Sequence, residues 1–170
     1  MFTLIVGGAA SGKSAFAEEI ALALPGERLY LATMEPFGRE ARERIARHRA
    51  LRAGKGFRTL ERYVNLAEAP IPPGQNILLE DLGNLTANEL FRPDGGGPEA
   101  VLAGVEALLD RCGHLTVVTN EVFSGGTDYE GDTLRWLSAL ARLNRRLAAR
   151  ADRVAEVVCG LPNLLKGALP

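Results

Sequence analysis

The segment GGAASGKS, residues 7–14, constrains this chain more than any other. It fits the pattern G-x-x-x-x-G-K-[ST], in which glycines let the backbone curl so that its N–H groups face phosphate oxygens. In such a loop the lysine, here Lys13, reaches the β and γ phosphates, and the hydroxyl of Ser14 binds Mg²⁺. Because the loop lies between an apolar run and a helix-forming run, a phosphate site is favoured over a plain glycine turn.

Five short apolar runs alternate with helical patterns along the rest of the chain. Nearly continuous apolar character is typical of parallel strands that are covered on both faces. The expected strands are Phe2–Val6, Arg28–Thr33, Asn76–Asp81, Leu115–Asn120 and Val154–Gly160, and the expected helices are 13–24, 38–53, 99–111 and 131–150. The alternation predicts one α/β domain over residues 1–170, with a P-loop NTPase-like open, mostly parallel sheet and helices on both faces.

Charge and composition narrow the partners that we expect. The formal net charge is −1, so no overall positive field favours nucleic acid or an anionic membrane. No apolar stretch approaches the length of about 18 residues that a membrane span needs. Cys112 and Cys159 lie far apart and form no C-x-x-C pair, which suits reduced thiols. We therefore expect a cytoplasmic protein with no membrane span and no nucleic-acid partner.

Polar residues follow the apolar runs at the points where ligands gather in parallel sheets. The run Asn76–Leu79 ends in Glu80 and Asp81, which is the form of a Walker B segment. An acid at this position can hold Mg²⁺ opposite the serine of the phosphate loop. Similar candidates follow other runs, at Thr33, Glu35, Asn120 and Glu121.

Residues 39–52, REARERIARHRALR, contain six arginines and the first of the two histidines. Most of these charges fit the solvated face of an amphipathic helix. Arg44, His48 and Arg52 are four residues apart, however, and share one helical face. The arginines disfavour the imidazolium form, which makes His48 a candidate neutral nucleophile, and they attract a triphosphate. His114 has no such neighbours and is expected to be structural or exposed.

Several motifs occur in an order that resembles a known family. They are GGAASGKS, RIARHRALR, Thr59-Leu60-Glu61, Leu78-Leu79-Glu80, VVTNEV (117–122) and LNRRLAARADRVAEVVCGLP (143–162). Together they resemble the bifunctional adenosylcobinamide kinase/adenosylcobinamide-phosphate guanylyltransferase of cobalamin biosynthesis, over nearly the whole chain. R-I-x-x-H-R-x-x-R combined with T-N-E-V is the specific part of the resemblance.

The resemblance implies a two-step enzyme. ATP or GTP phosphorylates adenosylcobinamide, and GTP then transfers GMP to adenosylcobinamide phosphate through a GMP-histidine intermediate. His48 and Lys13 would be catalytic, Ser14 and Glu80 would hold Mg²⁺, and the assembly would be a homotrimer. Nucleotide contacts would lie at Gly7, Gly8, Ala9, Ala10, Ser11, Gly12, Lys13, Ser14, Thr33, Met34, Glu35, Arg49, Ala50, Leu51, Arg52, Glu61 and Glu80.

Two departures from the family pattern concern the acceptor and the phosphates. Many members have arginine where Ala10 stands, and G-x-G-I-V-P where this chain has residues 123–128. Two other classes compete with the bifunctional enzyme. A plain P-loop small-molecule kinase would transfer only the γ phosphate and would need no role for His48. A GTP-dependent switch would need an N-K-x-D motif, whereas Asn120 is followed by Glu121.

Overall fold

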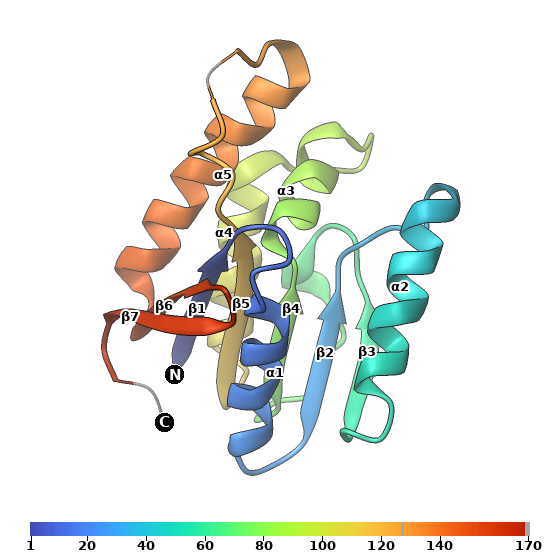
Figure 1. Cartoon of the computed structure of the whole chain (residues 1–170). Helices are drawn as coiled ribbons and strands as arrows, with labels where there is room; N and C mark the ends of the chain where they lie inside the picture. The colour runs from blue at the N-terminus through green and yellow to red at the C-terminus, as the bar shows by residue number, and fades with distance from the viewer. Residues whose placement is uncertain (127, 169–170) are drawn as a thin grey trace.

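The computed structural model describes residues 1–126 and 128–168, and its seven strands form one sheet (Figure 1). The order across the sheet is β3-β2-β4-β5-β1-β6-β7. Every neighbouring pair is parallel except β6 and β7, which are antiparallel. The strands are β1 (Phe2–Gly7), β2 (Arg28–Ala32), β3 (Phe57–Glu61), β4 (Asn76–Glu80), β5 (His114–Asn120), β6 (Arg153–Val158) and β7 (Leu161–Lys166).

Helices cover both faces of this sheet, as predicted. Helices α1 and α2 lie on one face and α3, α4 and α5 on the other. Their bounds are α1 (Lys13–Ala23), α2 (Gly38–Arg52), α3 (Leu82–Phe91), α4 (Gly97–Leu109) and α5 (Gly131–Arg150), with a short 3-10 helix at Leu66–Glu68. Within the described part of the chain, no helix combines the length and the apolar character that crossing a membrane requires.

Alternate residues of the central strands feed two separate cores. Leu29, Leu31 and Leu79 belong to the larger core, beneath α3, α4 and α5. Tyr30 and Leu78, one residue out of step, face α1 on the opposite side. Because both faces are buried, these strands have the continuous apolar sequences from which they were predicted.

All five predicted strands and all four predicted helices are present, with ends that differ by two residues at most. Strands β3 and β7 and helix α3 were not predicted. The edge strand β3 reads FRTLE and is largely exposed, and every residue of β7 is exposed, so neither has an apolar run. Helix α3 follows β4 directly, with Asp81 as its N-cap, so that no turn sequence marks its start.

His114 is a structural residue. Its side chain is 4% exposed, and its Nε2 lies 3.1 Å from the Thr3 hydroxyl on the neighbouring strand. Burial, reinforced by the N-terminal amine and Arg153, lowers the pKa of His114 to about 4. The sequence analysis expected His114 to be either structural or exposed, and it is structural.

The lowered pKa of His114 predicts a specific acid sensitivity. As pH falls from about 6.5, the unfolded chain takes up the proton before the folded chain does, so the free energy of unfolding decreases until about pH 4. The loss amounts to about 3 kcal/mol at most. His114→Gln, which does not titrate, is expected to flatten this part of the curve. Urea unfolding of both proteins from pH 8 to pH 4 measures the difference, and equal slopes would contradict it.

Candidate active site

The phosphate loop connects β1 to α1 at the carboxyl end of the sheet. Ala10 and Gly12 adopt left-handed conformations, with φ of 56° and 92°, and α1 begins at Lys13. The Lys13 ammonium donates to the Gly8 carbonyl at 3.0 Å and is 8% exposed. Burial lowers the pKa of Lys13, against the opposing charges of Asp81 and Glu80. A buried cation and a helix N-terminus at one loop form an anion site.

The turn between β6 and β7 supports this loop from behind. Gly160 donates its N–H to the Ser11 carbonyl at 2.8 Å. A Cβ on Gly7 would lie 2.8 Å from the Val157 carbonyl oxygen, and one on Gly12 would lie 3.0 Å from Cα of Gly160. The first contact is closer than real Cβ atoms show, and the second is tight at a residue whose φ of 92° already favours glycine, so both positions favour glycine for structural reasons.

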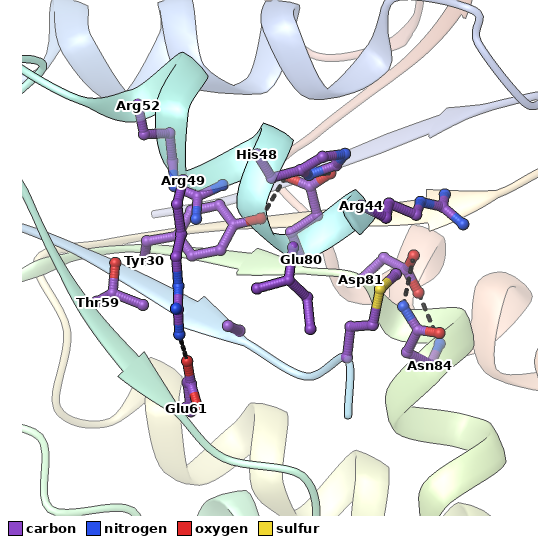
Figure 2. A pocket seen from close by; sticks show the side chains of 13 residues that line it. Tyr30, Arg44, His48, Arg49, Arg52, Thr59, Glu61, Glu80, Asp81 and Asn84 are labelled. Atoms are coloured by element: carbon purple, nitrogen blue, oxygen red, sulfur yellow. Dashed lines mark hydrogen bonds and ion pairs between the residues drawn. The ribbon is translucent and has the colours of Figure 1, made fainter. Parts of the chain in front are cut away.

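Glu80 is the acid that joins the elements of the site. It ends β4, and its Oε1 accepts a 2.5 Å hydrogen bond from the Ser14 hydroxyl. Its Oε2 accepts a bond from the Tyr30 hydroxyl at 3.0 Å, and Nδ1 of His48 lies 3.7 Å from Oε1 (Figure 2). The carboxylate is thereby fixed between the phosphate loop and α2.

The neighbouring Asp81 has a different task. Its Oδ1 accepts the backbone N–H of Asn84 at 2.6 Å, and its Oδ2 accepts the Asn84 side-chain amide at 3.0 Å (Figure 2). These bonds cap the N-terminus of α3. Burial raises the pKa of Asp81, against the Asn84 hydrogen bond. Since both carboxylate oxygens of Asp81 serve the cap, Glu80 is the acid left facing the phosphate loop.

Helix α2 forms one wall of a cavity above the ends of β2, β3 and β4. As their spacing predicts, Arg44, His48 and Arg52 line the same cavity. The 13 residues that line it are Tyr30, Ala32, Met34, Arg44, Ile45, His48, Arg49, Arg52, Thr59, Glu61, Glu80, Asp81 and Asn84 (Figure 2).

Arg52 carries buried donors that the described residues leave without a partner. It is 7% exposed, and its guanidinium carbon lies 3.3 Å from the centre of the Tyr30 ring. Its Nε and Nη1 are buried and have no hydrogen-bond partner among the residues described. A buried donor without a partner is costly, which favours a bound acceptor in this cavity.

The far side of the cavity carries a second carboxylate. Glu61, the last residue of β3, forms an ion pair with Arg49 (Figure 2). It also accepts a bond from the Tyr63 hydroxyl at 3.0 Å. The burial of Tyr63, followed by its bond to Glu61, raises the pKa of this tyrosine, which therefore stays a donor near neutral pH. Glu61 is thus oriented by two side chains.

The predicted nucleotide contacts do not all lie in this cavity. Glu61, Glu80, Met34, Arg49, Arg52 and His48 line it, and the loop Gly7–Ser14 adjoins it through the Ser14–Glu80 bond. Thr33 is buried and donates to the Asp81 carbonyl, and Glu35 forms an ion pair with Arg92. Ala50 and Leu51 are exposed on α2 and do not line it. Of the stretch 123–128, Thr127 lies outside the described residues.

Three polar lining residues, Tyr30, Thr59 and Asn84, were given no role at the site by the sequence analysis, although Thr59 lies in the quoted motif Thr59-Leu60-Glu61. A tyrosine inside the otherwise aliphatic run LYLA was the only signal for the first of them. Thr59 and Asn84 lie on β3 and α3, which the sequence did not predict, so neither could be placed at the site.

A parallel sheet whose first strand leads through a glycine-rich loop into a helix, with a buried lysine and an acid at the sheet edge, defines a P-loop nucleotide-binding protein. The model of the family "Cobinamide kinase / cobinamide phosphate guanyltransferase" matches residues 3–165. The chain belongs to this family.

Three relatives have the same kind of name and nearly the same length. The bifunctional adenosylcobalamin biosynthesis protein CobU of Escherichia coli K12 is 33% identical, over 95% of this chain and 97% of the relative. CobP of Pseudomonas aeruginosa PAO1, described in the same words, is 34% identical over 98% of both chains. CobU of Salmonella typhimurium LT2 is 33% identical over 95% of this chain and 97% of the relative.

Proposed function

We propose that this protein phosphorylates adenosylcobinamide with ATP or GTP and then transfers GMP from GTP to adenosylcobinamide phosphate through His48. The observation that carries the proposal is the position of His48, whose Nδ1 lies 3.7 Å from the carboxylate that also accepts the Ser14 hydroxyl. A histidine at this place is beside the phosphate loop and can reach a bound triphosphate. A simple kinase has no use for it there.

The first reaction uses the phosphate loop and Glu80 and needs no covalent intermediate. Lys13 and the N–H groups of the loop neutralise the β and γ phosphates while the substrate hydroxyl attacks the γ phosphorus. Ser14 and Glu80 would supply oxygen ligands of the kind that Mg²⁺ prefers, in place of the hydrogen bond that joins them in this structure. When bound, Mg²⁺ would neutralise phosphate charge. The described residues contain no cluster of three or more His, Cys, Asp or Glu side chains, so phosphate oxygens and water would complete its coordination.

The second reaction uses the imidazole as a nucleophile. Because Nδ1 is the ring nitrogen near Glu80, Nε2 would attack the α phosphorus of GTP, forming an N–P bond and releasing pyrophosphate. Arg44 and Arg52 would stabilise the charge on the phosphates. A phosphate oxygen of the acceptor then attacks the same phosphorus, which breaks the N–P bond and regenerates His48. The neutral state of His48 stays a prediction.

The two reactions occur at different phosphorus atoms, γ and α. The triphosphate must therefore be held in two registers, or α2 must move between the steps. Gly54 and Gly56, in the turn between α2 and β3, have φ of 80° and 73°. Two glycines in this turn would allow it to act as a hinge for α2.

The proposal is tested by incubating the protein with GTP labelled at the α phosphate. A GMP-histidine retains the label after denaturation, loses it in acid and keeps it in base. We expect covalent label, and adenosylcobinamide phosphate should discharge it as adenosyl-GDP-cobinamide. Transfer of label only from γ-labelled nucleotide, with no covalent label, would instead identify a simple kinase.

Glu61 is proposed to select guanine, because its carboxylate can accept bonds from the N1–H and amino groups that adenine does not offer together. Glu61→Gln is expected to reduce the preference of covalent labelling for GTP over ATP by about tenfold to a hundredfold. Competition between the two labelled nucleotides measures this ratio. Glu68→Gln, an exposed acid near Arg62, is the matched control. An unchanged ratio in Glu61→Gln would reject the assignment.

The proposed assembly is a homotrimer, as the family resemblance implies, and the proposed location is the cytoplasm, which two cysteines far apart in the sequence suit. Exposed apolar side chains on β7, Leu161, Leu164 and Leu165, offer surface that an oligomer would cover. Sedimentation equilibrium of the purified protein decides its oligomeric state.

A further inference from the structure

A second groove opens beside the cavity that contains His48. It has a volume of about 420 Å³ and lies between the N-terminal half of α2 and the start of α3. Met34, Arg44 and Asn84 line both the groove and the cavity, so the two are continuous. The groove is also lined by Glu35, Phe37, Glu40, Ala41 and Asn88.

We propose that this groove binds the amide-bearing edge of the corrinoid acceptor and directs its aminopropanol arm toward His48. The inference rests on the proposed function, which requires an acceptor next to the nucleotide. A corrin ring carries neutral acetamide and propionamide chains at its edge, separated by methyl groups. A site for this edge needs hydrogen-bond acceptors for amide N–H groups together with apolar surface.

Two asparagines provide the acceptors. Asn88 donates its amide N–H groups to the carbonyls of Thr33 and Tyr63, at 2.8 and 3.0 Å. Asn84 donates its own amide to Asp81 at 3.0 Å. With these donors engaged, the Oδ1 atoms of Asn84 and Asn88 accept no bond from the described residues. Both side chains are therefore fixed and can accept a hydrogen bond from a primary amide.

Phe37 provides the apolar surface. Its side chain is 88% exposed, although it precedes α2 at the rim of the groove. The segment that carries it is held in place, because the Phe37 N–H donates to the Glu35 carbonyl at 2.8 Å and the Glu35 carboxylate pairs with Arg92. An aromatic ring that a held segment exposes to water beside this cavity is suited to cover a large apolar ligand.

The size of the groove limits which part of the acceptor it can take. A volume of about 420 Å³ is that of a small-molecule pocket and is too small for an entire adenosylated corrin. Part of the edge can occupy it while the macrocycle and its adenosyl group stay outside. Arg44, which borders both spaces, lies one helical turn from His48 and can meet the phosphate at the end of the arm.

Phe37→Ala and Ala41→Phe test the proposal by removing the apolar surface and by filling the groove. Covalent GMP labelling requires GTP but no acceptor, so both variants should label His48 at the wild-type level. Phe37→Ala should raise the KM for adenosylcobinamide phosphate, and the Kd for adenosylcobinamide in equilibrium dialysis, by about tenfold or more. Ala41→Phe should abolish discharge of the label by the acceptor.

Two other exposed phenylalanines separate the possible outcomes. Phe91→Ala, at the end of α3, is the matched control and should keep the wild-type KM. Phe123, after β5, marks the competing location for the corrinoid. A raised KM in Phe123→Ala with a wild-type KM in Phe37→Ala would overturn the proposal. If the wild-type protein itself takes no label from GTP, the proposed function fails, and equilibrium dialysis still tests the groove.

Discussion

His48→Ala is expected to form no covalent GMP and no adenosyl-GDP-cobinamide, while it keeps a measurable share of its kinase activity. Without the imidazole, no group on α2 can form the N–P bond that divides guanylyl transfer into two steps. Transfer of the γ phosphate uses Lys13, Ser14 and Mg²⁺ and has no covalent step. Acid-labile label from α-labelled GTP measures the first activity, and adenosylcobinamide phosphate formed from γ-labelled nucleotide measures the second.

His114→Gln is the control for this experiment, because His114 is buried against Thr3 and far from the cavity that α2 lines. At pH 8 it should match the wild-type protein in both assays. Acid-labile label in His48→Ala would refute the role of His48. If His48→Ala folds normally but loses both activities, then His48 also shapes the phosphate site that serves the two reactions.

Lys13→Met is expected to slow both reactions by about a hundredfold, a loss of about 3 kcal/mol of transition-state stabilisation. Methionine keeps most of the length of the side chain and removes the charge that faces the phosphates. The buried Lys13 ammonium rests on the Gly8 carbonyl, so it is already positioned in the loop before nucleotide binds. Steady-state kinase rates and single-turnover GMP labelling measure the two losses.

Lys166→Met provides the comparison for this loss. Lys166 lies on β7 and donates to the carbonyls of Ala148 and Ala149, away from the phosphate loop. The variant should keep wild-type rates in both reactions. Near wild-type turnover in Lys13→Met would remove the phosphate loop from the mechanism.

The part of the fold that the sequence predicts is the part buried on both faces. Central strands such as β4 have continuous apolar sequences. The loop at Gly7–Ser14 has a pattern that predicts a strand before it and a helix after it. Edge strands are different, because β3 and β7 place charged and polar residues in water and have no apolar run. Their existence depends on pairing with β2 and β6, which a single segment cannot reveal.

The residues of the candidate site also divide into those that sequence spacing predicts and those that only strand pairing brings together. The four-residue spacing of Arg44, His48 and Arg52 places them on one face of α2, and all three line the cavity. The contact between Arg49 and Glu61 instead requires β3 to lie beside β2, and that of Tyr30 with Glu80 requires β2 to lie beside β4. Contacts between neighbouring strands are long-range in sequence, so neither could be inferred from spacing.

The phosphate loop packs against β6 and the turn after it. This packing affects which residues would be retained in a related chain that has lost the activity. In a descendant that no longer binds nucleotide, Gly7 would still be favoured by its contact with Val157, and Gly12 by its φ of 92° and its contact with Gly160. Lys13 and His48 would no longer be needed for catalysis, so both positions could be substituted. A glycine-rich loop that is retained in such a lineage would then indicate only the fold. Whether a related chain is still catalytic should be judged from the presence of the lysine and the histidine.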